Sequence, residues 1–243
     1  MLYLIFMMME TRSNKIIVAE FYKKIVGQRD SSLINTYVRK DYIQHSAMGK
    51  PGRDGLFEMV EFLKTLPPSA ESISPIKMLI GDGDMVAILL DISFMGKRML
   101  VIDLFRLNDN MLAEHWDSVQ EIPVDQNEIN IISTAVDTSA NKQLVSEFYR
   151  EGFTNGRTDL LAQYLSPDYK NHSEAFETYT NYQLKVHRII GEGALVVVQS
   201  ELVRNAVSFA LYDILRIKDN LIAEHWSVQQ LIPDVIPHNN GIF

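Results

Sequence analysis

The chain has 243 residues, a formal net charge of −8 and no cysteine. An acidic chain without a Lys/Arg cluster is not expected to bind nucleic acid, and the lack of cysteine excludes disulfides, thiolate zinc sites and cysteine nucleophiles. Its hydrophobic fraction of 47% is sufficient for a globular core, and the absence of thiols fits a reducing compartment such as the cytoplasm.

The chain begins with an apolar leader, MLYLIFMMM (residues 1–9). This leader is too short to span a bilayer, and it lacks the basic start and the cleavage site of a signal peptide. Met7, Met8 and Met9 are alternative starts, so the leader either belongs to the protein or precedes its true start. Later apolar runs are interrupted by charges, and we expect a soluble cytoplasmic protein that binds no membrane.

Three helices are expected after the leader. Apolar residues recur at helical spacing in KIIVAEFYKKIV (15–26) and in SSLINTYV (31–38), which begins with a serine that can cap a helix. The third helix, DGLFEMVEFLKTL (54–66), has Asp54 as its cap and ends before Pro67-Pro68.

From residue 76 to residue 122 the pattern changes to strands. The turns between these strands are GDGD (81–84), MGK (95–97) and NDN (108–110). Three helices followed by a meander of strands predict an α+β domain in which the helices pack on one face of an antiparallel sheet.

The second half of the chain repeats the first. YVRKDYIQHS (37–46) returns 127 residues later as YLSPDYKNHS (164–173), and VIDLFRLNDN (101–110) returns 110 residues later as LYDILRIKDN (211–220). The order of the matches is kept, so this is a tandem duplication whose second copy has lost about 17 residues around the third helix. We therefore expect a complete domain at 10–123 and a degenerate, shortened domain at 142–234, joined by a linker at 124–142.

Both copies close with nearly the same phrase. MLAEHWDSVQEIP (111–123) and LIAEHWSVQQLIP (221–233) contain the only two tryptophans of the chain, and only the first copy has an aspartate, Asp117, after its tryptophan. Alternation along a strand would direct Glu114 and Trp116 to one face and His115 and Asp117 to the other. Trp116 is expected in a core or cavity wall, and His115 either at an interface or in a site.

Asp103 and its counterpart Asp213 lie inside apolar strands, where a carboxylate is costly to bury. Asp103 either forms a structural ion pair, for example with Arg106, or faces an apolar cavity with a raised pKa suited to proton transfer. Asp91 is a second interior acid, matched in the second copy by Glu201. It either completes an acid/base pair with Asp103 or points to solvent.

His45 and its counterpart His172 close the repeated Asp-Tyr-x-(Gln/Asn)-His-Ser unit. An imidazole at this position could line a cavity and exchange protons, or it could be a loop histidine bonded to the backbone. No motif with metal-ligand spacing, phosphate-binding glycine loop or serine-hydrolase elbow is found, so neither a metal nor any other cofactor is expected.

The first copy resembles the SnoaL-like polyketide cyclases of the nuclear transport factor 2 and ketosteroid isomerase superfamily. The resemblance rests on YIQHS, GRDGLFEMVEFL, GDGDMVAILLDI and VIDLFRLNDNMLAEHWDSVQ, which together cover nearly all of residues 16–123. It implies cone-shaped domains whose curved sheet and helices enclose an apolar pocket. It also implies that Asp103 acts as the acid/base of a cofactor-free aldol closure. We expect His45 and Asp91 to assist it and the ligand to be small and apolar or polyketide-like.

Further side chains are expected along the pocket, namely Tyr42, Phe57, Phe105, Trp116 and His115. The second-domain equivalents of Asp103, His45 and Trp116 are Asp213, His172 and Trp226. The chain departs from the family in lacking a histidine in the strand before Asp103, and its second copy lacks the helix that covers the pocket. We therefore expect a second domain that is mainly structural. Because such domains commonly pair through their sheets, we also expect an intrachain pseudo-dimer, with a further homo-oligomer left open.

Two functions remain open from the sequence. One is an aldol-type cyclase or isomerase whose site lies in the first domain. The other is a non-catalytic module of the same fold that binds an apolar ligand or a protein, because one fold serves unrelated functions.

Overall fold

The computed structural model describes residues 13–67, 74–123, 129, 131, 133–173 and 182–243. The apolar leader at 1–9 lies outside these residues. In the first domain, α1 (Asn14–Glu20) runs on into the π-helical η2 (Phe21–Gly27), and the short η3 (Ser31–Leu33) leads into α2 (Ile34–Tyr37). The third helix, α3 (Gly52–Thr65), stops before Pro67, whose ring restricts the preceding residue to an extended conformation.

The first sheet has the order β1-β5-β4-β3-β2. Four of its strands form the expected antiparallel meander, namely β2 (Ile76–Asp82), β3 (Met85–Phe94), β4 (Lys97–Asn108) and β5 (Met111–Ile122). β1 (Val38–Gln44) is not among the predicted strands, and it pairs with β5 in parallel. This pairing joins segments about 70 residues apart, which local periodicity cannot indicate.

The second domain repeats this arrangement with fewer helices. Helix α4 (Thr138–Tyr149) begins inside the expected linker, because the Asp137 side chain caps it, and continues into η4 (Arg150–Thr154) and η5 (Thr158–Tyr164). The sheet has the order β6-β10-β9-β8-β7, formed by β6 (Leu165–Asn171), β7 (Tyr182–Glu192), β8 (Leu195–Arg204), β9 (Val207–Lys218) and β10 (Leu221–Leu231). The predicted α+β fold of two tandem domains is therefore confirmed. Within 133–173 and 182–243, no helix corresponds to α3.

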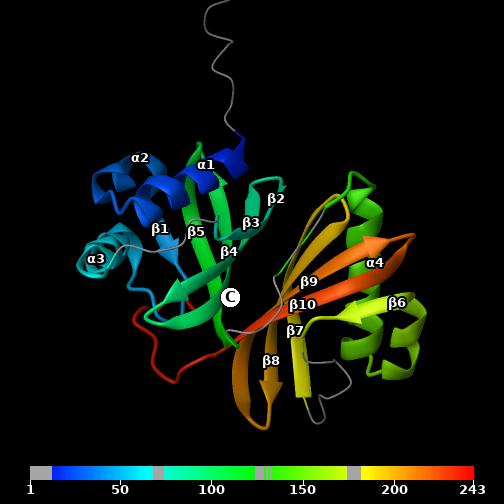
Figure 1. Ribbon diagram of the computed structural model, residues 1–243. Coiled ribbons are helices and arrows are strands. Elements are labelled where there is room, and N and C mark those ends of the chain that lie inside the picture. The colour runs from blue at the N-terminus through cyan, green and yellow to red at the C-terminus, as the bar shows by residue number, and fades with distance from the viewer. Residues whose placement is uncertain (1–12, 68–73, 124–128, 130, 132, 174–181) are drawn as a thin grey trace, which may run out of the picture.

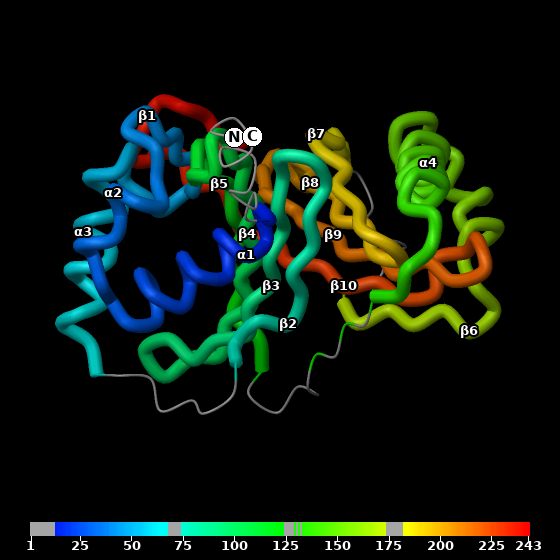
Figure 2. Tube along the Cα trace, turned by 90° about the horizontal axis from the view of Figure 1, so that it is seen from above, coloured from blue at the N-terminus to red at the C-terminus, as the bar shows by residue number. Residues whose placement is uncertain are grey.

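The two sheets pack against each other, and the helices lie on the outer faces (Figures 1 and 2). The faces that meet share one apolar cluster, which includes Leu104 and Trp116 from the first sheet and Tyr212, Ile214 and Trp226 from the second. Separate clusters lie between each sheet and its own helices. Each sheet is thus buried on both faces.

Several polar contacts between the domains come in reciprocal pairs, in which each domain supplies the counterpart of the residue that the other supplies. Lys15 binds Glu192 at 2.5 Å, and its counterpart Lys142 binds Asp82, the counterpart of Glu192. The amide of Val119 donates to Gln230 Oε1 and that of Gln229 donates to Gln120 Oε1, both at 2.9 Å. Exchanged contacts of this kind characterise a two-fold interface between identical subunits, and here one chain supplies both sides.

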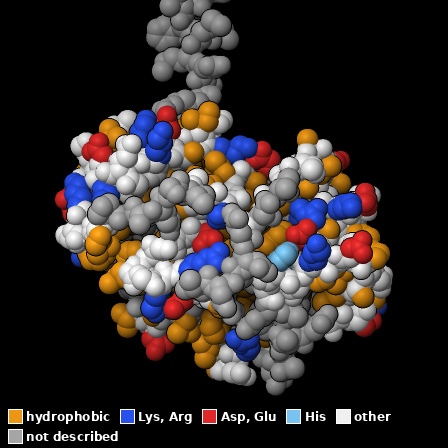
Figure 3. Space-filling model, in the orientation of Figure 1, with side chains coloured by type: hydrophobic (Ala, Val, Ile, Leu, Met, Phe, Trp, Pro, Cys, Tyr) orange, Lys and Arg blue, Asp and Glu red, His pale blue; other side chains and the backbone are white. Residues whose placement is uncertain are grey.

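The helices among the described residues are too short or too polar to cross a membrane. On the face shown in Figure 3, acidic and basic side chains are interspersed, and neither sign gathers into one patch.

Candidate acid/base site

Asp103 lies on β4, on the face of the sheet that the helices cover, and is only 3% exposed. The Tyr22 hydroxyl, from η2, donates to its Oδ2 at 2.5 Å, and His115 Nε2, from β5, lies 2.7 Å from its Oδ1. Both carboxylate oxygens are therefore engaged. The ion pair with Arg106 that the sequence left open does not form, since Arg106 binds Glu114.

His115 lies between two acceptors. Its Nδ1 is 2.8 Å from Gln44 Oε1, which also accepts from the Ser46 amide, while its Nε2 faces Asp103. With an acceptor at each nitrogen, the ring is held as the doubly protonated imidazolium. Burial alone lowers the pKa of His115, but the hydrogen bond and the charge of Asp103 and the charge of Asp117 outweigh burial and raise it.

Asp117 pairs with Asp103 across β4 and β5. Burial, assisted by the charge of Asp103, raises the pKa of Asp117 to about 6, while the charge of His115 and a hydrogen bond from Ser46 act in the opposite direction. Its Oδ1 is buried and has no hydrogen-bond partner among the described residues. Of the three groups, only Asp117 keeps partial exposure. Asp117 is thus the carboxylate with a free oxygen and a pKa near neutrality.

Buried tyrosines and phenylalanines surround these charges. Burial, followed by the charge of Asp103, raises the pKa of both Tyr22 and Tyr42, so both stay protonated and able to donate. Phe105 stacks on His115 with ring centroids 4.6 Å apart, and Phe57 packs at the edge of the same cluster. Tyr42, Phe57, Phe105 and His115 therefore lie on the side of the sheet where the sequence analysis placed a pocket.

Other expected site residues lie on the opposite face of the sheet. The neighbours of Asp91 along β3 point to the helix-covered face, so Asp91 itself points to the opposite face. There Arg98 donates two hydrogen bonds to it, at 2.8 and 3.0 Å. His45 stacks on Trp116 at 4.9 Å and binds Glu114 at 2.8 Å. Asp103 therefore contacts neither Asp91 nor His45 but has Asp117 as its neighbouring acid. Trp116 belongs to the core between the sheets and not to this site.

The second domain repeats the buried network. The Tyr149 hydroxyl donates to Asp213 Oδ2 at 2.6 Å, and His225 Nε2 lies 2.8 Å from Asp213 Oδ1. On the opposite face, His172 stacks on Trp226 as His45 does on Trp116. The residue opposite Asp213, however, is Ser227. The domains therefore share the tyrosine, aspartate and histidine, and they differ in the acid at position 117.

Tyr22, Gln44 and Asp117 were not among the site residues that the sequence predicted. A signal for two of them was present. Tyr22 recurs as Tyr149 within the repeated Phe-Tyr pair, and Asp117 is the acid that differs between the two closing phrases. Gln44 recurs only as the shorter Asn171, and its role depends on β1, a strand that the sequence does not reveal.

The group of Asp103, His115 and Asp117 is also the set of described side chains that could hold a metal ion, since their ligand atoms lie within 4.8 Å of one another. The sequence showed no such set because the ligands come from neighbouring strands. In this arrangement His115 Nε2 and Asp103 Oδ1 are hydrogen-bonded to each other.

The structure also has a cavity of about 180 Å³, between the two sheets and not over Asp103. Its walls include Leu89, Leu100, His172, Trp226 and Gln229.

No model of a known protein family matches the chain, and no curated protein matches its sequence. Solved structures match about half of it. IdmH, a candidate polyketide cyclase from Streptomyces antibioticus, is 19% identical over 45% of this chain and 93% of its own, with a TM-score of 0.37. A candidate polyketide cyclase from Acidithiobacillus ferrooxidans is 20% identical over 46% and 92%, with a TM-score of 0.37. A candidate ketosteroid isomerase from Kribbella flavida is 17% identical over 43% and 86%, with a TM-score of 0.35. Likenesses this distant assign no activity.

Proposed function

We propose that the first domain catalyses proton transfer next to a carbonyl group of a small apolar substrate, leading to aldol cyclisation or isomerisation without a cofactor. The observation that carries this proposal is the pair Asp103–Asp117. The two acids face each other in a buried cluster, and Asp117 has a free oxygen and a pKa of about 6. A general acid/base works best with a pKa close to the working pH.

The sequence resemblance assigned the acid/base role to Asp103. Because both oxygens of Asp103 accept hydrogen bonds, we assign the proton transfer to Asp117. Asp103 then holds His115 as an imidazolium next to the reacting group. The buried hydroxyl of Tyr42 is the donor that we assign to the developing enolate oxygen.

The reaction balances without a co-reactant. The Asp117 carboxylate takes the proton from the carbon next to the carbonyl, and the C–H electron pair passes into the enolate. In an aldol closure, the enolate carbon bonds to a second carbonyl carbon of the same molecule, and the protonated Asp117 returns the proton to the alkoxide formed there. In an isomerisation, the proton returns to another carbon of the conjugated system.

The experiment is hydrogen exchange at carbon, followed by NMR in D₂O with a panel of poly-β-keto esters and β,γ-unsaturated ketones. We expect exchange with the intact protein to rise as the pH passes about 6 and to survive EDTA. Asp117→Asn should lower the rate about 10²–10⁴-fold, the usual contribution of a general acid or base. Asp91→Asn, on the opposite face, is the matched control and should keep the rate. Wild-type exchange by Asp117→Asn would refute the proposal.

The cavity between the sheets favours a second function, the binding of a small apolar ligand. Leu89, Leu100 and Trp226 would form the apolar wall around such a ligand. A thermal-shift screen with small phenols and alcohols tests this function. A stabilising compound should lose its effect in Leu100→Phe, which fills part of the cavity, but not in Asp117→Asn, and a screen in which no compound stabilises the protein would reject it.

A further inference from the structure

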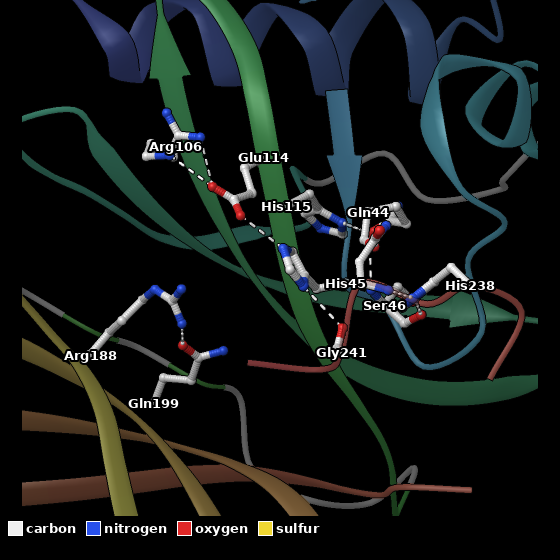
Figure 4. Close-up of polar contacts among 11 residues, drawn as sticks. Gln44, His45, Ser46, Arg106, Glu114, His115, Arg188, Gln199, His238 and Gly241 are labelled. Atoms are coloured by element: carbon white, nitrogen blue, oxygen red, sulfur yellow. Dashed lines mark hydrogen bonds and ion pairs between the residues drawn. The ribbon is translucent and has the colours of Figure 1, made fainter. Parts of the chain in front are cut away.

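The C-terminal segment of the chain leaves the second domain and contacts the end of β1 in the first (Figure 4). His238 Nε2 donates to the Ser46 carbonyl at 2.8 Å, and Asn240 Nδ2 donates to the Gln44 carbonyl at 2.9 Å. The Gly241 carbonyl lies 2.9 Å from His45 Nδ1. The segment thus binds each of three consecutive residues, 44–46, at the end of β1.

Among the described residues, no such segment binds the equivalent strand end of the second domain. His172 makes the same contact with a glutamate and the same stack on a tryptophan as His45 does. Yet the side chain of His172 is 38% exposed and that of His45 only 7%. The Gly241 carbonyl, which binds His45 Nδ1, contributes to this difference.

The residues that the segment binds also hold the acid/base cluster. Gln44 Oε1 accepts from His115 Nδ1, and the same oxygen accepts from the Ser46 amide. The Ser46 side chain lies close enough to Asp117 to lower the pKa of that carboxyl. A shift of β1 at Gln44 or Ser46 would therefore move the partners of both His115 and Asp117.

We propose that the C-terminal segment, residues 238–241, is a positioning element of the first-domain site, holding Gln44 and Ser46 so that they orient His115 and Asp117. This inference rests on the proposed function, since it concerns the same acid/base groups. Its positioning residues are His238 and Asn240, which touch no reacting atom. It also gives the second domain a role, because that domain delivers the segment.

The test uses NMR on the full-length chain, following the ring nitrogens of His115 and the side-chain carboxyl of Asp117. His238→Ala and Asn240→Asp each remove a donor to β1. We expect the His115 ring shifts to change and the Asp117 titration midpoint to rise by about half a pH unit or more, because the Ser46 hydrogen bond that lowers it is weakened. His238→Gln keeps a side-chain N–H donor and should restore both signals.

Asn239→Asp is the matched control, because it introduces the same charge at an exposed neighbour and should leave both signals unchanged. A chain ending at Pro237 should show both changes together, and the substitutions test the same contacts if that chain fails to fold. Unchanged signals in folded His238→Ala and Asn240→Asp would overturn the inference. An Asp117 midpoint near 4 in the intact protein would refute the proposed function instead, and the His115 ring shifts would then decide the role of the segment alone.

Discussion

Asp117 lies directly opposite Asp103 across β4 and β5, whereas Ser227 lies opposite Asp213 at the same point of the second domain. Around this difference the two domains keep the same tyrosine, aspartate and histidine in the same hydrogen bonds. In both copies, each oxygen of the buried aspartate already accepts a hydrogen bond. The acid present in only one copy is therefore the group to which we assign the proposed proton transfer.

Asp117→Ser should stabilise the protein at neutral pH. The folded-state pKa of Asp117 is about 6, above the usual value of 3.8, so folding opposes its ionisation. The penalty is absent below about pH 4, grows between about pH 4 and 6, and is complete above about pH 6. We expect a gain of about 1–3 kcal/mol at pH 7.5, partly offset because the Asp117 charge also stabilises protonated His115. Urea unfolding at pH 4 and 7.5 measures this gain, and an equal effect at both pH values would contradict it.

Ser227→Asp is the reciprocal change. It places a second acid opposite Asp213, which is 1% exposed. We expect the free energy of unfolding to fall by about 1–3 kcal/mol at pH 7.5 and by less at pH 4, where the new acid is protonated. Urea unfolding provides the measurement, with Ser227→Asn as the uncharged control of similar size. A loss that is the same at both pH values would mean that size, not charge, is responsible.

Much of the fold is visible in the sequence because its signals are local. Helical spacing and the Pro67-Pro68 stop predict α1 and α3, and glycine and asparagine turns separate β2 to β5. The two-residue turn at Met95-Gly96 sets the register between β3 and β4 and so places Ile88 opposite Asp103. Asp91 is thereby placed on the other face, and this could have been derived from the turn.

The pairing of the two acids could not be derived in this way. If the register set by the turn at Asp109-Asn110 continued along both strands, Asp103 would lie opposite Trp116. Between Leu112 and Glu114, however, the register shifts by one residue, and this bulge brings Asp117 opposite Asp103 instead. The contacts of Gln44 depend on the parallel pairing of β1, which is likewise non-local. The sequence therefore indicates the residue types of the site but not which of them meet.

Tyr22→Phe should lower stability and proton-transfer activity together. It removes the donor to Asp103 Oδ2 and leaves a buried carboxylate oxygen unpaired, which costs about 1–3 kcal/mol. Tyr149→Phe, the matched control, removes the equivalent bond to Asp213 and should cost a similar free energy of unfolding. Only Tyr22→Phe should reduce exchange at carbon, measured by NMR at a temperature where both variants are folded. If both variants lost activity equally, the activity could not be assigned to the first-domain site alone.

Trp116→Ala should destabilise both domains at once. Trp116 is 1% exposed in the core between the sheets, stacked on His45 and covered by the guanidinium of Arg188, 3.9 Å from its ring. Removing this ring should cost about 3–5 kcal/mol. Because the sheets share one core, the fluorescence of Trp226 in the variant and the far-UV circular dichroism should report one unfolding transition at a lower urea concentration than in wild type.

Trp116→Phe distinguishes packing from hydrogen bonding in that core. The indole Nε1 of Trp116 is buried and has no hydrogen-bond partner among the described residues, so phenylalanine loses ring area but also removes an unpaired donor. We expect a smaller cost than for alanine, about 1–2 kcal/mol, with the transition still single. If Trp226 reported a midpoint unchanged by Trp116→Ala while circular dichroism showed a second, earlier transition, the domains would unfold independently. The exchanged contacts between Lys15 and Glu192 and between Lys142 and Asp82 would then connect two separate cores, and not two halves of one.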